Sequence, residues 1–471
     1  MSIMSAGSQS IAKAESPFVS AFGISVVVFV LLAVVFLHIL GVPLAGFALL
    51  LLAGTLLWMA FRYPTTALGA VLALMSIYPI AFLLAKFFGP PYIASFEGCD
   101  RVALLGLACI LWRQNGIKLR APDWFLLACF GLAVVRLAFG GSLIILLADF
   151  SFMIAYAAGR VAPLTAGQQK FWATCAVWII AVLSVVGMLE VFVTGPDPRS
   201  VLYFSTANAY AADGTIDGRF FATSFAGLRE SSTMISPPFF ALLCMTALVL
   251  WWVYCRNLFP AAMICAGLIC TVTRSAWFAT VAAFVVLAVL MGQKRRLALY
   301  ATLALALFVA SVPILGLGDY LLSTKTGLDP SAQQHQNSLV EGSLFVIGNP
   351  FGAGPGNYDR PGGGEHTENM SSSAPFIENA YLMLAAEYGV VTGLCFLGFL
   401  LSALRLSLRE RNLLGYAAVG ILVGFGGAMV VAPLLRDFAL ASWIWFPVGM
   451  VVRSSTVLQD RSPYSEQTIE Q

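Results

Sequence analysis

Glu378 and Asn379 stand where a long polar segment meets an apolar helix, in the stretch FIENAYLMLAAEYGVVTGLCFL (376–397). A carboxylate at such a boundary could act as the general base for a hydroxyl nucleophile. The same position also suits residues that satisfy the first turn of a helix, because the helix dipole favours an anion there. The two roles are compatible. We predict that Glu378 is a catalytic base and that Asn379 caps the helix and contacts substrate.

Arginines form the second set of candidate groups. They fall near the expected outer ends of apolar runs, where a charge is costly and usually faces a polar cavity or a partner. Snorkelling to the headgroups or pairing with a nearby acid is the structural alternative. Taken together they indicate an anion site, since a guanidinium fork binds diphosphate bidentately and keeps its charge. The candidates are Arg101, Arg136, Arg219, Arg229, Arg274 and Arg436.

His335 and Tyr381 complete the candidate site. His335 opens an amphipathic stretch, 335–348, and is expected either to bind diphosphate or sugar or to face water. Tyr381 could stack on a sugar, although aromatic residues at helical spacing more often belong to a core or an interface. The stretch NPFGAGPGNY (349–358) is turn-rich, but no Gly-Lys-Ser/Thr follows it, so we exclude a nucleotide site. No zinc spacing is present, and we expect neither a metal nor a cofactor.

The elements that must position these residues are membrane helices. Of 471 residues 59% are hydrophobic and 10% are charged, whereas a soluble domain carries roughly 25% charged residues. Repeated apolar runs predict an all-α polytopic membrane protein with about 12–14 transmembrane helices in a single domain, 1–471. The runs 143–158 and 380–403 are each expected to form one span. The first run, from Phe18, lacks a cleavage site and is expected to be retained.

The distribution of Lys and Arg orients the chain. With both termini in the cytoplasm, about 16 of the 26 basic residues fall on the cytoplasmic side, among them Arg160 and Lys170. Two long polar segments, 194–236 and 318–379, then lie on the opposite side. The second is expected to hold a short helix, a turn and a Gly- and Ser-rich flap over the site.

In this order the motifs resemble the O-antigen ligase and O-antigen polymerase superfamily of bacterial membrane glycosyltransferases. The resemblance covers roughly residues 205–452. It rests on Arg219 ahead of one span, TRSAW around Arg274, the loop 349–358, and ENAYLMLAAEYGVVTG from Glu378 to Gly393. It implies a GT-C-like fold in the bacterial inner membrane, with a periplasmic active site.

The resemblance also implies the reaction and its partners. A glycan would pass from a polyprenyl diphosphate to an acceptor hydroxyl without a metal, with polysaccharide assembly and export proteins nearby and no nucleic acid involved. Arg219 and Arg274 are then the first choices to stabilise the departing diphosphate. The next candidates for this role are Arg229, Arg136 and Arg436.

Two departures from the family pattern bear on the acceptor. Many ligases have His where this chain has Glu378, and Arg in the loop helix where it has His335. These residues resemble the variant of repeat-unit polymerases of exopolysaccharide or O-antigen, which we favour. The alternative is a ligase that transfers the glycan to a lipid A-core or another acceptor. From other classes, a lipid-linked oligosaccharide flippase and a scaffold protein remain, although no matched halves of a transporter are visible.

Overall fold

The computed structural model describes residues 62–79, 99–189, 192, 237–296, 298, 330–356, 377–432, 434–435 and 437–459. The candidates Arg219, Arg229 and Arg436 lie outside the described residues, as do the polar segment 194–236 and the predicted flap. Every element of regular structure in these described ranges is a helix. The chain is an all-α polytopic membrane protein, as predicted. The helices are α3 (Pro64–Met75), α5 (Cys99–Asn115), α6 (Ala121–Leu137), α7 (Leu143–Asp149), α8 (Phe152–Val161), α9 (Ala166–Leu189), α11 (Pro237–Tyr254), α12 (Leu258–Cys270), α13 (Arg274–Leu290), α16 (Pro330–Gly348), α17 (Ala380–Tyr388), α18 (Val390–Arg409), α19 (Leu413–Ala428) and α20 (Phe438–Gln459).

Several of these helices are long and apolar enough to cross a bilayer. In the described part of the chain α9, α11 and α18 meet that requirement singly. The predicted single span 143–158 is instead a bent pair, because α7 and α8 meet at 45°. Shorter apolar helices are α3, α12, α13, α19 and residues 438–454 of α20. The predicted total of 12–14 spans stays a prediction.

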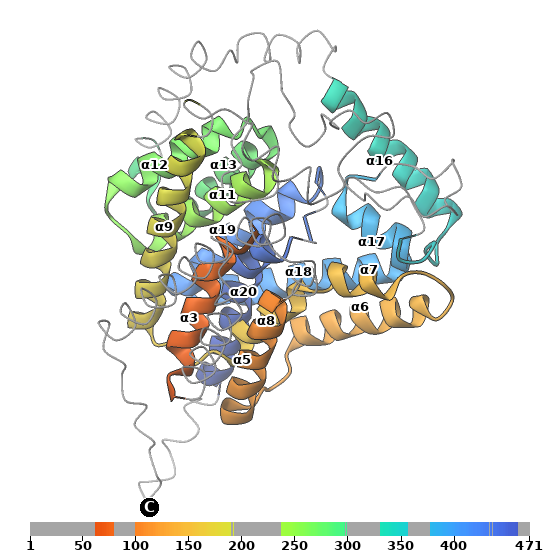
Figure 1. The fold of residues 1–471 in the computed structure, drawn as a ribbon, viewed down its shortest axis with the longest axis horizontal. Helices are drawn as coiled ribbons and strands as arrows, with labels where there is room; N and C mark the ends of the chain where they lie inside the picture. Colours follow the sequence, from red (N-terminus) through yellow and green to blue (C-terminus); the bar gives the residue numbers. More distant parts are fainter. Residues whose placement is uncertain are drawn as a thin grey trace, which may run out of the picture.

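Helix α11 forms the centre of one half of the bundle, with α9, α12, α13 and α19 around it. The other half is built on α20, α8 and α18 (Figure 1). Small residues bring α8 and α20 into contact, since a Cβ on Gly159 would lie 2.1 Å from the Phe446 carbonyl oxygen. Trp445 fills the core beside them, 5.1 Å from the Phe152 ring and 5.2 Å from the Phe399 ring.

Basic residues gather at one end of the bundle, which we call the inner end. The end of α5, the start of α6, the end of α8 and the second half of α20 meet there, as Asn115 and Arg453 both donate to the carbonyl of Val161. The start of α19 joins them, because Leu414 packs beside Val451. Arg160 was expected in a cytoplasmic loop, and this expectation is wrong: Arg160 belongs to the last turn of α8, and its side chain is 3% exposed.

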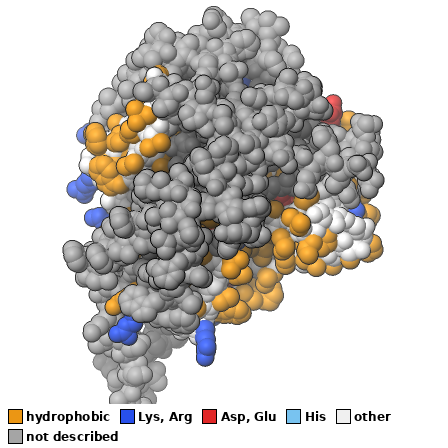
Figure 2. Space-filling model, viewed as in Figure 1, with side chains coloured by type: hydrophobic (Ala, Val, Ile, Leu, Met, Phe, Trp, Pro, Cys, Tyr) orange, Lys and Arg blue, Asp and Glu red, His pale blue; other side chains and the backbone are white. Residues whose placement is uncertain are grey.

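The opposite, outer end holds the starts of α13, α17 and α20 and the end of α19. Helix α19 runs outward from the inner end and finishes beside α17, where the Ala380 amide donates to the Met429 carbonyl. Helix α13 runs back against α19, with Gly420 beside Leu287 and Gly424 beside Ala279. Exposed hydrophobic side chains gather over α6 and α7 in Figure 2 and suit contact with lipid.

Candidate functional site

The candidate site begins at a break in a membrane helix. The predicted single span 380–403 is two helices, α17 and α18, separated by Gly389 at φ 94° and ψ 158°. This backbone conformation is open essentially to glycine alone. The hydropathy of the sequence runs on across the break, and so it could not reveal the interruption.

Residues 350–356, which we call the clasp loop, fill this break. The amides of Ala353 and Gly354 donate to the carbonyls of Ala386 and Glu387 at 2.7 and 2.9 Å. The amide of Val390 donates to the carbonyl of Pro350 at 2.9 Å. These groups would be left without partners at a helix interruption, and at membrane depth each would cost several kcal/mol. The clasp loop therefore makes the broken helix possible.

Glycine in the clasp loop permits this close approach. Gly352 has φ 80°, and a Cβ there would lie 2.5 Å from the Glu387 carbonyl oxygen. Gly354 and Gly356 also have positive φ. The glycine-rich stretch that the sequence marked as turn-rich is thus a segment whose backbone docks into the helix break.

Arg136 ties the clasp loop to a third element. Its Nε donates to the Gly352 carbonyl at 3.0 Å, from the last turn of α6. The Ser142 amide, just before α7, donates to the Pro355 carbonyl at 2.8 Å. The Nη1 atom of Arg136 is buried and has no hydrogen-bond partner in the described part of the chain. Arg136 therefore positions the loop and keeps an unused donor.

Glu378 and His335, two of the predicted site residues, are in contact. The imidazole Nδ1 of His335, on α16, meets the Oε2 atom of Glu378. The two side chains are 38% and 17% exposed. The Glu378 amide donates to the Ser338 hydroxyl at 2.7 Å, which fixes the mouth of α17 against α16. The amphipathic helix predicted at 335–348 is confirmed as the main part of α16.

Asn379 and Tyr381 hold the start of α17. The predicted capping role of Asn379 is confirmed, because its Oδ1 accepts from the amides of Tyr381 and Leu382 at 2.9 and 3.0 Å. The Tyr381 hydroxyl donates to the Gly426 carbonyl of α19 at 2.9 Å. Both side chains are thus engaged by the protein itself.

Arg274 lies at the same outer end of the bundle as Glu378. It is the first residue of α13, is partly buried, and follows Val272, whose φ of 48° is rare for a β-branched residue. Since α13 and α17 both begin at the outer end beside α19, Arg274 and Glu378 flank the same helix end. The fold therefore brings a cation and an acid to one end of the bundle.

Arg101 has a packing role at the same end. Its guanidinium carbon lies 5.5 Å from the centre of the Phe438 ring. Next to it, burial raises the pKa of Asp437 to about 6, and Asp100 adds to the rise while Arg101 opposes it. The Asp437 carboxylate also accepts from the Leu440 amide and so caps α20.

Two buried acids near the break were not among the site residues predicted from the sequence. Glu387 is fully buried, and its Oε1 accepts from the Gly356 amide at 3.3 Å. Asp149, at the end of α7, accepts from the Tyr388 hydroxyl at 2.8 Å. The available signal was a carboxylate inside an otherwise apolar run, which is costly unless it has partners.

Comparison with known families covers the same part of the chain. Residues 259–397 match the family described as O-antigen ligase. This segment of the chain is therefore similar to the O-antigen ligase family. The matched segment runs from α12 into α18, and so it contains Arg274, His335, the clasp loop and Glu378. The match confirms the resemblance to the ligase and polymerase superfamily. Searches of curated proteins and of solved structures found no match.

Proposed function

We propose that this protein is a membrane glycosyltransferase that moves a glycan from a polyprenyl diphosphate to an acceptor hydroxyl at the periplasmic face. The observation that carries the proposal is the contact between His335 and Glu378 inside the segment that matches the O-antigen ligase family. Both side chains are partly exposed, so a substrate hydroxyl can reach them. A dyad of this kind can take up a proton as the hydroxyl attacks.

The chemical step divides between the acid and the cations. The acceptor oxygen loses its proton to Glu378, backed by His335, and bonds to C1 of the donor sugar. The bond between C1 and the diphosphate oxygen breaks at the same time, and the lipid diphosphate leaves as an anion. Fixed cations stabilise that anion best when they are already in place. Arg274 is our first choice from the described residues, with Arg219 as its predicted partner.

The remaining candidates take supporting roles in this proposal. Arg136 orients the clasp loop and offers its buried Nη1 donor toward the anion. Asn379 and Tyr381 hold the start of α17, so the position of Glu378 depends on them. Arg229 and Arg436 remain candidates for binding the donor.

Two acceptors fit this chemistry. The match to the O-antigen ligase family favours transfer of a finished glycan to a lipid A-core or similar acceptor. The residue types at positions 335 and 378, His and Glu, resemble the variant of repeat-unit polymerases and favour a polymerase, whose acceptor is a second lipid-linked repeat unit. For both acceptors we propose that the protein lies in the bacterial inner membrane with cytoplasmic termini. The basic residues at the inner end of the bundle support this orientation.

The glycan profile of cells lacking the gene separates these functions. Accumulation of single repeat units, free or capped onto an acceptor, is expected for a polymerase. Long polymer left on the polyprenyl diphosphate is expected for a ligase. Repeat units held on the cytoplasmic side would contradict the proposal and indicate a flippase.

Complementation of that strain tests the anion site. Arg274→Ala should reduce transfer by roughly 10²–10³-fold, as expected for the loss of one fixed donor to a developing anion. Arg295→Ala is the matched control, since this exposed arginine lies beyond the opposite end of α13. Normal transfer by Arg274→Ala in a protein that still inserts would remove Arg274 from the mechanism.

A further inference from the structure

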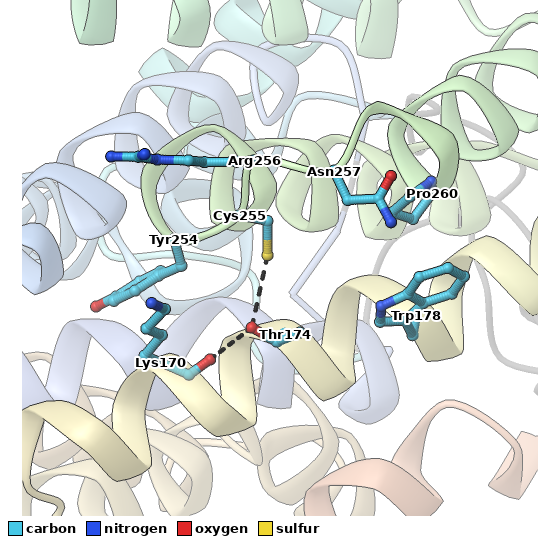
Figure 3. Close-up of a pocket in the computed structure, with 8 residues that line it drawn as sticks. All are labelled: Lys170, Thr174, Trp178, Tyr254, Cys255, Arg256, Asn257 and Pro260. Carbon is cyan, nitrogen blue, oxygen red and sulfur yellow. Dashed lines mark hydrogen bonds between the residues drawn. The ribbon is translucent and has the colours of Figure 1, made fainter.

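A cavity of about 420 Å³ lies at the inner end, opposite to the outer end that holds Glu378 and Arg274. It is formed where α9 passes the turn between α11 and α12 (Figure 3). Both α9 and α11 are long enough to cross a bilayer, so their ends mark the level of the lipid headgroups. The cavity is therefore at membrane–water depth.

Hydrogen-bond donors dominate the polar lining of this cavity. Lys170, on α9, and Arg256, in the turn, contribute two exposed cations. Asn257 uses its Oδ1 to cap α12, which leaves its amide NH₂ as a further donor. Within the described part of the chain no Asp or Glu lines the cavity. The chemistry is that of an anion site.

Tyr254 supplies an independent sign of a missing ligand. It is the last residue of α11 and is 8% exposed, yet its hydroxyl has no hydrogen-bond partner in the described part of the chain. A buried hydroxyl without a partner costs free energy, so such groups normally have a hydrogen-bond partner, which a ligand in this cavity would supply. Figure 3 draws Tyr254 at the same end of the cavity as Lys170 and Arg256.

The other end of the cavity is apolar and opens toward lipid. Trp178 lines it, is 39% exposed, and lies 6.2 Å from the Phe259 ring, measured between ring centres. Phe259 and Val182 are also exposed on this side. Trp is favoured at the headgroup level of a membrane, where one end of the ring is apolar and the other is wet. A ligand with an anionic head and an apolar tail fits both ends.

We propose that this cavity binds the phosphate group of an anionic phospholipid from the inner leaflet. Lys170 and Arg256 pair with the phosphate, Tyr254 donates to one of its oxygens, and the acyl chains lie over Trp178 and Phe259. The binding does not depend on the glycosyl transfer proposed above. It would anchor the α9, α11 and α12 half of the bundle against the leaflet.

Lipid retention measured by native mass spectrometry on the full-length protein tests this site. The probes are phosphatidylglycerol and, as the neutral comparison, phosphatidylcholine. Each cation near an anionic surface is worth about 1 kcal/mol, so Lys170→Ala with Arg256→Ala should lower phosphatidylglycerol retention about 25-fold. Tyr254→Phe keeps the ring and should lower it about fivefold. Arg113→Ala, an exposed arginine outside the cavity, should leave it unchanged.

Three results would overturn the proposal. The first is equal retention of phosphatidylglycerol by wild type and the double variant, and the second is equal retention of the two lipids by wild type. The third is thermal stabilisation by inorganic phosphate without any effect of phosphatidylglycerol, which would make the ligand a soluble phosphate. Because Lys170 and Arg256 are exposed, their loss should not prevent folding, and Tyr254→Phe provides a second variant if it does.

Discussion

Two paired carboxylates at opposite ends of the bundle differ in how completely their oxygens are used. Asp123, at the inner end, accepts from the Arg160 side chain at 2.9 and 3.0 Å and from the Tyr156 hydroxyl at 2.8 Å. The Arg120 amide adds a fourth bond at 2.7 Å. The Asp123 and Arg160 side chains are 7% and 3% exposed. This acid has no capacity left for a substrate.

Glu378, at the outer end, has far fewer partners for its carboxylate oxygens. Its carboxylate contacts His335 and has no other side-chain partner in the described part of the chain, and both residues are partly exposed. The surrounding groups, Ser338 and Asn379, hold the backbone and leave the carboxylate alone. The comparison teaches that a charged pair with every bond satisfied is a structural feature, whereas a partly exposed pair with spare capacity is available for chemistry.

The largest expected effect is loss of catalysis at the outer acid. Glu378→Gln keeps the shape of the side chain but cannot accept a proton, so transfer should fall by roughly 10²–10⁴-fold. The thermal unfolding of the purified protein should not change, because no buried charge is left unpaired. Transfer by complemented cells and unfolding in detergent measure the two quantities. Full turnover by Glu378→Gln would end the general-base role.

The inner acid should behave in the opposite way. Asp123→Asn leaves the Arg160 charge buried without its counter-ion, which should destabilise the protein by about 3–5 kcal/mol. We expect a lower yield and a lower unfolding temperature in detergent, with unchanged transfer per folded molecule. Unaltered stability would show that buried pairing and exposure do not separate the two acids.

The third largest expected effect is that of replacing the glycine at the helix break. Gly389→Ala should cost about 1–3 kcal/mol, because Ala disfavours this φ and ψ and its Cβ would lie 3.0 Å from the Phe351 backbone. The clasp loop should loosen, so amide exchange at 352–356 should become faster and transfer should fall. Gly131→Ala is the matched control, since that helical glycine has open space beside it. Equal exchange in both variants would contradict the docking role of Gly389.

The smallest expected effect concerns Tyr381. Loss of its bond to the Gly426 carbonyl in Tyr381→Phe should cost about 0.5–1.5 kcal/mol, with a modest fall in transfer. Comparing the loss of stability with the loss of transfer in this variant shows whether Tyr381 acts only through the fold. A fall in transfer of more than about tenfold, which is 1.4 kcal/mol, at unchanged stability would mean that Tyr381 contacts the sugar directly, as the sequence predicted.

Several features of the site followed from local sequence alone. The cap at Asn379, the helix that carries His335 and the start of α13 at Arg274 each depend on residues a few positions apart. Local patterns of this kind can be read from one segment at a time. The resemblance to the ligase and polymerase superfamily rested on the order of these segments, and the family match bears it out.

The sequence by itself determined the class of the protein, because hydropathy and the sparing use of charge force an all-α membrane fold. It also marked the glycines of residues 350–356 as a turn. Only the tertiary structure decided that this turn docks into a broken helix, that Asp123 is saturated and that Glu378 meets His335. The reason is physical: each outcome depends on which donors and acceptors from distant segments meet in space, and hydrogen-bond satisfaction is a property of the packed molecule.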